Sequence, residues 1–448
     1  MRSLRERCEV TVKKYPTEPL RCWARAKEIR ENYYKNYALA KERGGLRWTG
    51  GTWAFDAIPL GLGEDVFSLC GEPYAATTMG IPEHKAFGYK CLEACAGKGY
   101  AHDLCPYLRV YLGSVILNQY TFGGQFPRPD FIWQTHICCS HSKWYENVSD
   151  LLGGIPMFCV DVSVGPYKDL KAHAIEYVVA QMHEGIEWLG KVSGRKYDDE
   201  KLIEAVYNHC RVSSLWAEVC TFNKTIPAPL DEKSMFSLFN LGALTKATKE
   251  IANFYEEVRD EVKDRASRGI AAIGSETFRY MTDAEPPWSF LKLWRYLEKF
   301  GGVSIGSIYS HSLIGMWGDQ EDGTLGPRKT PQQKGIHIRN RDQALRILVE
   351  WQLALPDWQG YYDVRLKSEH MIRIAREWRC NYALMHFNRG CEGTSVGLPE
   401  NRAALIKAGI PTLAFEGNMA DPGEIDEAGI LHRLDVFLDA HGHKRLED

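Results

Sequence analysis

Short apolar runs alternate along this chain with longer segments in which apolar residues recur at the spacing of a helix. The runs are bounded by polar residues, glycine or proline, which predicts strands. They occupy residues 130–137, 155–162, 269–276, 302–310, 381–387 and 410–417. Apolar strands separated by helical segments are typical of βα units, in which helices cover both faces of a parallel sheet. The pattern therefore predicts an α/β protein with parallel sheets.

The predicted strands form two groups along the chain. A helical pattern from about residue 168 to residue 268 separates the groups, and one further predicted helix at 18–43 ends at Gly44 and Gly45. We therefore divide the chain into four parts. They are an N-terminal helical segment at 1–45, a first α/β domain at 46–166, a helical insert at 167–268 and a second α/β domain at 269–448.

Composition and charge narrow the class of protein. The chain has 448 residues, of which 44% are hydrophobic and 25% charged, as in ordinary globular proteins. Its net charge of −3 provides no field that would recruit nucleic acid or an anionic membrane. The chain has no run of about 18 apolar residues, which a membrane-spanning helix would need. The first residues lack the apolar core of a signal peptide. We expect a cytoplasmic protein.

Three of the 13 cysteines stand where α/β proteins form sites. Such sites lie beyond the carboxyl ends of strands, and Cys138 and Cys391 each follow a predicted strand. Cys105 lies in the first turn of a predicted helix with Asp103 as a candidate N-cap. The positive end of that helix is expected to lower the pKa of the thiol, and a thiolate is what a metal binds.

These three thiols allow more than one interpretation. Three thiolates would leave one metal position open, which suits a catalytic metal site better than a closed structural one. Composition alone favours the plainer alternative, in which Cys105, Cys138 and Cys391 are small buried core residues. The neighbouring Cys139 would point to the opposite side of the chain from Cys138 if the strand continued.

Four segments carry a family resemblance. "DLCPYLRVYLG", "HICCSHSKWYE", "HFNRGCEGTS" and "FEGNMADPGEID" resemble, in order and spacing, the 2-hydroxyacyl-CoA dehydratase / benzoyl-CoA reductase family. The resemblance extends from about residue 45 to residue 429. The sequence around the cysteine pair is most similar to that of the larger core subunit of the ATP-dependent benzoyl-CoA reductases.

The resemblance implies a fold, a cofactor and a set of ligands. The family has two Rossmann-like domains in each subunit and one [4Fe-4S] cluster held by three cysteines, which correspond here to Cys105, Cys138 and Cys391. Glu72 corresponds to a family glutamate near the substrate. A family serine has no clear counterpart, because Thr49 and Thr52 stand in that region.

The resemblance also implies an activity and partners. We predict an iron-sulfur core subunit of an oxygen-sensitive, ATP-dependent benzoyl-CoA reductase, which dearomatises the ring of benzoyl-CoA with low-potential electrons in anaerobic aromatic degradation. A related second core subunit, an ATP-hydrolysing iron-sulfur activator and ferredoxin as the upstream donor are the implied partners. The chain has no G-x-x-x-x-G-K-[ST] motif, which agrees with ATP being used by the activator.

Two alternatives and two further residues complete the prediction. The first alternative is a 2-hydroxyacyl-CoA dehydratase, which uses the same cluster for a radical elimination of water; the second is a zinc-binding or structural subunit. His136 and His141 flank the cysteine pair and are candidate proton donors, although a histidine near a strand end is often structural.

Overall fold

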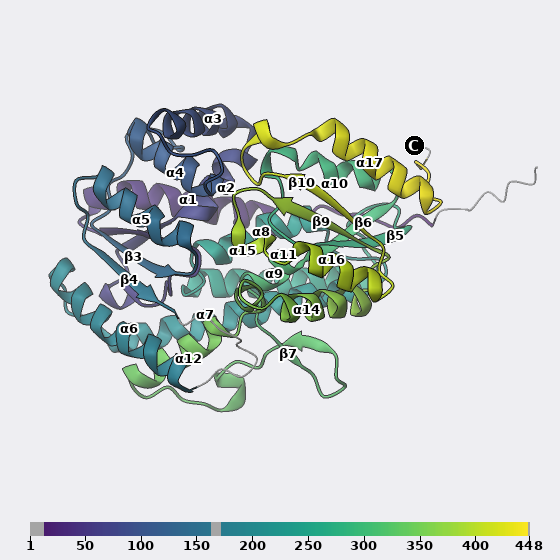
Figure 1. Cartoon of the computed structure of the whole chain (residues 1–448). Helices are drawn as coiled ribbons and strands as arrows, with labels where there is room; N and C mark the ends of the chain where they lie inside the picture. The colour runs from purple at the N-terminus through teal and green to yellow at the C-terminus, as the bar shows by residue number, and fades with distance from the viewer. Residues whose placement is uncertain (1–12, 163–171, 447–448) are drawn as a thin grey trace, which may run out of the picture.

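Two four-stranded parallel sheets form the centre of the molecule (Figure 1), a computed structural model that describes residues 13–162 and 172–446. The first sheet has the strand order β2-β1-β3-β4 and the second the order β10-β9-β5-β6. The strands are β1 Leu46–Gly50, β2 Val66–Cys70, β3 Phe131–His136, β4 Met157–Asp161, β5 Phe278–Thr282, β6 Gly302–Ser307, β9 Tyr382–Asn388 and β10 Thr412–Gly417. The predicted α/β class with two Rossmann-like domains is confirmed.

Each sheet has a point at which the direction of its connections reverses. From β1 the chain moves outward to β2 and then returns to β3 on the other side of β1. In the second sheet β5 leads outward to β6, and the chain returns to β9 on the other side of β5. Loops leave in opposite directions at such a switch point and open a crevice beyond the strand ends. Figure 1 shows β3 and β4 running toward β9 and β10, so the two crevices face one another.

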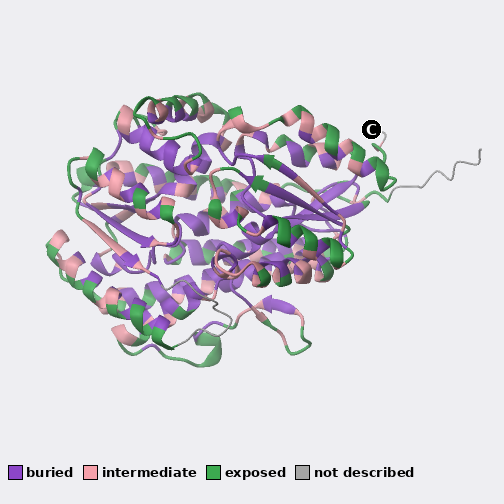
Figure 2. Cartoon of the chain, in the orientation of Figure 1, coloured by how far each residue is buried: buried purple, intermediate pink, exposed green. Residues whose placement is uncertain are grey.

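Helices surround both sheets, and the strands are largely buried beneath them (Figure 2). The helices are α1 Trp23–Leu39, α2 Gly71–Gly80, α3 Pro82–Gly97, α4 Pro106–Leu117, α5 Cys139–Leu151, α6 Ala172–Ser193, α7 Asp199–Thr221, α8 Glu232–Leu244, α9 Lys249–Arg268, α10 Lys292–Glu298, α11 Ile308–Ser312, α12 Arg341–Leu353, α13 Pro356–Gly360, α14 Val364–Glu377, α15 Glu392–Ser395, α16 Leu398–Lys407 and α17 Glu427–Ala440. A hairpin of β7 Trp317–Asp319 and β8 Leu325–Pro327 and the short 3-10 turns η1 Lys41–Arg43, η2 Pro59–Leu62, η3 Phe222–Lys224, η4 Trp288–Phe290, η5 Gln332–Lys334 and η6 Pro422–Glu424 complete the chain.

Helix α9 illustrates how the sequence sets the limits of an element. The Thr248 hydroxyl accepts a hydrogen bond from the backbone N–H of Ile251 and caps the start, and Gly269 adopts a left-handed conformation with φ of 68° at the end. Between them Ile251, Tyr255, Val258 and Val262 recur at helical spacing and are all buried.

One predicted strand is wrong, and three strands of the two sheets were not predicted. Residues 269–276 form no ladder because Gly269 ends α9, and Ala271 makes only an isolated bridge to Thr17. The strand of this unit is β5, which begins at Phe278. Strands β1 and β2 were also missed, because arginine, threonine and serine interrupt their apolar residues.

The other predictions agree in position and differ at the ends of elements. The first helix begins at Trp23 and not at residue 18. The run 302–310 ends as a strand at Ser307, whose side chain caps α11. Helices α6 to α9 fill the region predicted to be helical. The boundary at 166–167 lies outside the described residues, and the other domain boundaries stay predictions.

A buried carboxylate ties the helical region to the second sheet. Glu232, at the start of α8, is completely buried and accepts hydrogen bonds from four side chains. They are Thr282 Oγ1 at 2.7 Å, Trp294 Nε1 at 2.9 Å, Ser304 Oγ at 2.6 Å and Ser310 Oγ at 3.4 Å. These donors come from β5, α10, β6 and α11, so one side chain organises four elements.

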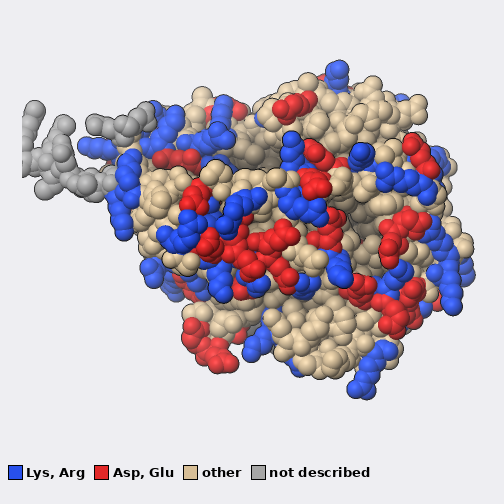
Figure 3. All heavy atoms as spheres, turned by 180° about the vertical axis from the view of Figure 1, so that it is seen from behind, with Lys and Arg blue, Asp and Glu red and all other residues tan. Residues whose placement is uncertain are grey.

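The surface carries mixed charge. Figure 3 shows acidic and basic side chains interspersed over the face opposite to that of Figure 1. Many of them are paired, as in the contacts of Arg25 with Glu250 at 2.7 Å and Arg268 with Asp264 at 3.1 Å. Within residues 13–162 and 172–446, every helix is too short or too polar to cross a lipid bilayer.

Asp283, just beyond β5, provides a test of the packing. Its side chain is buried; Oδ1 accepts the backbone N–H of His386 at 2.9 Å, and Oδ2 has no hydrogen-bond partner among the described residues. Burial raises the pKa of Asp283 to about 6. Because the folded-state pKa exceeds the unfolded one, the folded state favours the protonated acid, and this contribution to stability is lost as pH rises through about 6.

We therefore expect Asp283→Asn to stabilise the protein at pH 8, where it removes a buried negative charge, by on the order of 2 kcal/mol. The gain should vanish near pH 4, where the carboxyl group is already neutral. Chemical denaturation at both pH values measures it, with the exposed Asp439→Asn as the matched control. An equal effect of Asp283→Asn at both pH values would contradict the assignment.

Candidate functional site

One pocket collects the loops that follow the strands of both sheets. It encloses about 720 Å³, its open mouth included. Its lining includes Thr52 after β1, Glu72 after β2, Cys138 after β3, Glu285 after β5, Tyr309 after β6 and Cys391 after β9. The pocket therefore occupies the place where the two switch points meet, as expected for an open α/β sheet.

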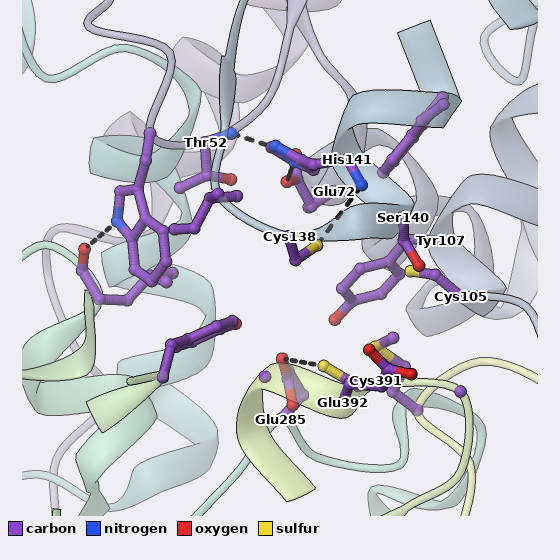
Figure 4. A pocket seen from close by; sticks show the side chains of 18 of the residues that line it. Thr52, Glu72, Cys105, Tyr107, Cys138, Ser140, His141, Glu285, Cys391 and Glu392 are labelled. Atoms are coloured by element: carbon purple, nitrogen blue, oxygen red, sulfur yellow. Dashed lines mark hydrogen bonds and ion pairs between the residues drawn. The ribbon is translucent and has the colours of Figure 1, made fainter. Parts of the chain in front are cut away.

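The three predicted ligand cysteines line this pocket. Figure 4 shows the sulfurs of Cys138 and Cys391 facing one another, with Cys105 beside them. Each cysteine is the N-cap residue of a helix: Cys105 of α4, Cys138 of α5 and Cys391 of α15. The sulfur of Cys138 accepts the backbone N–H of His141 at 3.4 Å. Thiolates at these positions would lie against the backbone N–H groups of the first helical turns.

The loops that carry Cys105 and Cys391 touch. Gly390 adopts φ of +79°, and a Cβ atom there would lie 3.0 Å from the carbonyl oxygen of Leu104 and 3.1 Å from Cδ of Pro106. The positive φ therefore favours glycine, and the close neighbours leave little space for a side chain. Close by, the buried Arg109 donates to Asp421 Oδ2 at 3.0 Å and links α4 to the loop after β10.

Burial determines the ionisation of the three thiols. It raises the pKa of Cys138 to about 11 and the pKa values of Cys105 and Cys391 further above the usual range. Neighbouring backbone N–H groups oppose this rise but do not overcome it. The predicted lowering of the Cys105 pKa by the start of the helix is therefore present, but burial outweighs it and the net pKa is raised. The prediction of Asp103 as the N-cap is wrong, because Cys105 occupies that position.

Glu72 and His141 form a buried pair in the wall of the pocket. Nε2 of His141 contacts Oε1 of Glu72, and Oε2 accepts the backbone N–H of Thr52 at 3.1 Å. Burial opposes ionisation of both groups, but their mutual attraction lowers the pKa of Glu72 and raises the pKa of His141. Their contact therefore favours the form in which Glu72 is a carboxylate and His141 an imidazolium. Both residues were predicted from the sequence, and the structure brings them together.

Two other predictions near the cysteine pair have a different outcome. The ring of His136 is half exposed and contacts Asp161 on the neighbouring strand at 3.1 Å, and His136 is not among the described residues that line the pocket. Strand β3 ends at His136 and α5 begins at Cys139, so strand alternation does not continue through the cysteines. Cys139 is exposed, whereas Cys138 lines the pocket.

Glu285 lines the pocket and was not predicted from the sequence. Its carboxylate accepts from Thr394 Oγ1 at 2.7 Å and lies 3.5 Å from the sulfur of Cys391. The residue follows β5, the strand that was placed too early in the sequence. Two acidic residues in "TDAEPP", directly after an apolar run, were the available signal.

Aromatic side chains close one side of the pocket. Trp53 donates from Nε1 to the carbonyl oxygen of Leu313 at 2.8 Å, and its ring packs against Trp358 and Tyr361 with centroids 5.2 and 5.4 Å away. Trp144 stacks on Tyr145 with centroids 5.2 Å apart. These rings provide an apolar wall that weakens the screening of charges inside the pocket.

Comparison with known proteins identifies the family. The profile of the family described as "2-hydroxyglutaryl-CoA dehydratase, D-component" matches residues 53–440. The chain belongs to this family. The predicted resemblance is thereby confirmed, and the chain is a member of an enzyme family that includes acyl-CoA dehydratases and a benzoyl-CoA reductase.

Individual relatives share about a quarter of their residues with the chain. The (R)-2-hydroxyisocaproyl-CoA dehydratase alpha subunit of Clostridioides difficile is 27% identical, over 91% of this chain and 92% of the relative. The (R)-phenyllactyl-CoA dehydratase alpha subunit of Clostridium sporogenes is 24% identical, over 79% and 83% respectively. A subunit of the benzoyl-CoA reductase of Thauera aromatica is 22% identical, over 78% of both chains.

Three thiols are the candidate metal donors of the pocket. Among the described residues, no three histidine, cysteine or acidic side chains lie close enough together to hold a single metal ion. The three thiols line the pocket, and each comes from the N-terminus of a helix. Thiolates are the usual ligands of iron-sulfur clusters, so Cys105, Cys138 and Cys391 fit the cluster that the family resemblance implies.

The ionised state of the Glu72–His141 pair is testable in the metal-free protein. We expect Glu72→Gln to lower the pKa of His141, because the charge that raises it is removed. More of the imidazole is then neutral at pH 7, and diethyl pyrocarbonate should modify His141 several-fold faster. Mass spectrometry of peptides measures the rate, with the exposed Glu93→Gln as control. An unchanged rate in Glu72→Gln would refute the ion pair.

Proposed function

We propose that this chain is the cluster-binding subunit of a 2-hydroxyacyl-CoA dehydratase. In this proposal Cys105, Cys138 and Cys391 hold a [4Fe-4S] cluster, and the Glu72–His141 pair moves the protons of the elimination. The observation that carries the proposal is the convergence of three N-cap thiols and one buried acid–base pair on the same pocket. From the sequence the three cysteines were predicted as cluster ligands of a reductase, Glu72 as a residue near the substrate, and His136 and His141 as candidate proton donors.

The relatives favour the dehydratase over the benzoyl-CoA reductase that the sequence motifs predicted. Dehydratase alpha subunits at 27% and 24% identity match this chain, whereas the reductase subunit matches at 22%. The family profile is that of a dehydratase component. The prediction of a reductase depended on the sequence around the cysteine pair, which is a short part of the chain.

The protein's own residues would prepare the site in two ways. Backbone N–H groups at the starts of α4 and α5 point at the sulfurs and stabilise negative charge there. The rings of Trp53 and Tyr361 limit water, so that the charges of Glu72 and His141 act at short range on a bound acyl-CoA. When bound, the cluster would supply one-electron chemistry and an open iron as a Lewis acid.

The acid–base pair suits a redox-neutral elimination. Loss of water from a 2-hydroxyacyl-CoA needs one group that takes a proton from carbon and one that gives a proton to the departing hydroxyl group. A carboxylate in contact with an imidazolium provides both functions. No external proton is consumed over the whole cycle.

The proposal includes partners outside this chain. The dehydratase relatives are named as alpha subunits, and the reductase relative is likewise named as one subunit, so these proteins belong to multi-subunit enzymes. We infer a related second core subunit and a separate iron-sulfur activator that hydrolyses ATP and receives its electrons from ferredoxin.

Ring reduction of benzoyl-CoA is the second candidate, supported by the match to a benzoyl-CoA reductase subunit over 78% of both chains. The two activities differ in their use of electrons, because dehydration recycles a starter electron whereas ring reduction consumes a pair in each turnover.

We expect the complex, purified without oxygen, to convert a 2-hydroxyacyl-CoA with many turnovers for each electron supplied. Chromatography of the products against a reductant titration measures this ratio. Two electrons consumed for each benzoyl-CoA converted would support the reductase instead.

The cysteine pair allows a matched test of the ligands. Cys138→Ser should lose most of the iron and all activity, because the sulfur in the pocket is removed. The neighbouring Cys139→Ser should keep its iron, because Cys139 is exposed. Iron analysis and the visible absorption of protein purified without oxygen measure both outcomes. Equal loss of iron in the two variants would show that the ligand assignment is wrong.

A further inference from the structure

Three buried polar residues behind the pocket leave four atoms without hydrogen-bond partners among the described residues. Asp56 follows β1, His209 lies in α7, and Lys246 lies between α8 and α9. Their exposed fractions are 8%, 0% and 1%. The four atoms are Asp56 Oδ1, both ring nitrogens of His209 and Lys246 Nζ.

Two of the three side chains approach each other directly, and the third residue adjoins them through the backbone. Nδ1 of His209 lies 3.6 Å from Oδ1 of Asp56, which is too long for a good hydrogen bond. The other oxygen of Asp56 accepts the backbone N–H of Ala247 at 3.0 Å, which fixes the adjoining Lys246 beside it. Buried polar atoms are satisfied by protein or by ordered water, and a buried water molecule needs two to four polar partners. This cluster provides such partners.

The cluster borders a cavity other than the active-site pocket. A second cavity of about 870 Å³, its open mouth included, is lined by Asp56, Thr245 and Tyr33. Cys70 contacts one lining residue of each cavity, Tyr33 of the second cavity and Glu72 of the active-site pocket. The backbone N–H of Cys70 donates to the Tyr33 hydroxyl at 3.0 Å, and its sulfur lies 3.8 Å from Oε2 of Glu72.

We propose that Asp56, His209 and Lys246 bind internal water molecules that, together with the thiol of Cys70, carry protons between Glu72 and the solvent of the second cavity. The proposal rests on the proposed function, because it gives Glu72 a proton to exchange. It makes Lys246 and His209 positioning residues for the reaction, since neither lines the active-site pocket.

The transfer balances without a further reactant. A proton that leaves the Glu72–His141 pair passes to the first group of the chain, each member accepts one proton and releases another, and the last releases a proton to bulk water. No electron moves, and every member returns to its starting state. An acyl-CoA bound in the active-site pocket would block the direct path for protons from Glu72 to solvent. A second path would then let those protons reach solvent.

The electrostatics agree with this geometry. Burial lowers the pKa of His209 to about 4, so its ring is neutral at physiological pH and has one donor and one acceptor nitrogen. Burial also lowers the pKa of Lys246 to about 8, although Asp56, Cys70 and Cys210 face it and oppose the change. A group with a pKa near the working pH releases and regains a proton readily.

The test compares two isotope exchanges in the complete enzyme complex at chemical equilibrium. A 2-hydroxyacyl-CoA and its enoyl-CoA product are incubated in D₂O enriched in ¹⁸O. Entry of ¹⁸O into the hydroxyl group reports turnover, and entry of deuterium at the carbon next to the hydroxylated carbon reports exchange of the moved proton with solvent. The ratio of the two rates cancels a general loss of activity.

We expect Lys246→Met to lower the deuterium-to-¹⁸O ratio by at least about fivefold, because the abstracted proton returns before it can exchange. Lys246→Gln, which keeps polar atoms for water, should recover part of the ratio. The exposed Lys249→Met, three residues further along, should leave the ratio unchanged. Iron content and thermal unfolding confirm that each variant is folded.

The outcomes separate the two proposals. A normal ratio in a folded Lys246→Met enzyme that still incorporates ¹⁸O would overturn the relay and leave the dehydratase intact. Absence of both isotopes from the substrate with the wild-type complex would overturn the proposed function and the relay with it. If Lys246→Met fails to fold, Asp56→Asn replaces it, with the same expected fall in the ratio.

Discussion

The direct contact between the loops of Cys105 and Cys391 is the constraint on which the site depends. The two loops come from opposite halves of the chain, and their backbones meet at Gly390, where a side chain would be strained by the positive φ and crowded by Leu104 and Pro106. The buried contact of Arg109 with Asp421 fixes the same junction from the side of α4. Because the two sheets also turn their switch points toward this junction, backbone packing positions the loops that carry the thiols.

The environment of the thiols opposes the ionisation that cluster binding requires. Burial favours the neutral thiol, whereas a cluster needs thiolates, so assembly must release protons as positive iron enters. Helix N-termini reduce this cost at each sulfur without removing it. In the nearby pair of Glu72 and His141 the balance is opposite, because their mutual attraction outweighs burial and favours the ionised form of both groups. The pocket therefore holds neutral ligands next to a charged acid–base pair.

Much of this arrangement could be predicted from the sequence, and the failures have physical reasons. Cys138 and Cys391 were found because their strands are continuous apolar runs, and such runs end at sites in parallel sheets. Glu285 was missed because its strand, β5, contains an arginine and was confused with the glycine-containing segment before it. His136 lies outside the pocket lining, because side chains alternate along a strand and its ring turns toward Asp161 on β4. Sequence periodicity says nothing of the contact between Glu72 and His141, which joins two separate loops.

The position of Glu232 has a consequence for how such proteins could be recombined. Its carboxylate belongs to the helical region, yet its four donors belong to the second sheet and the helices around it. A fragment that begins at residue 269 would leave those donors buried and unsatisfied. The helical region therefore cannot be removed without disturbing the second sheet. A chimera that exchanges the carboxy-terminal half between relatives must include α8 in the exchanged part.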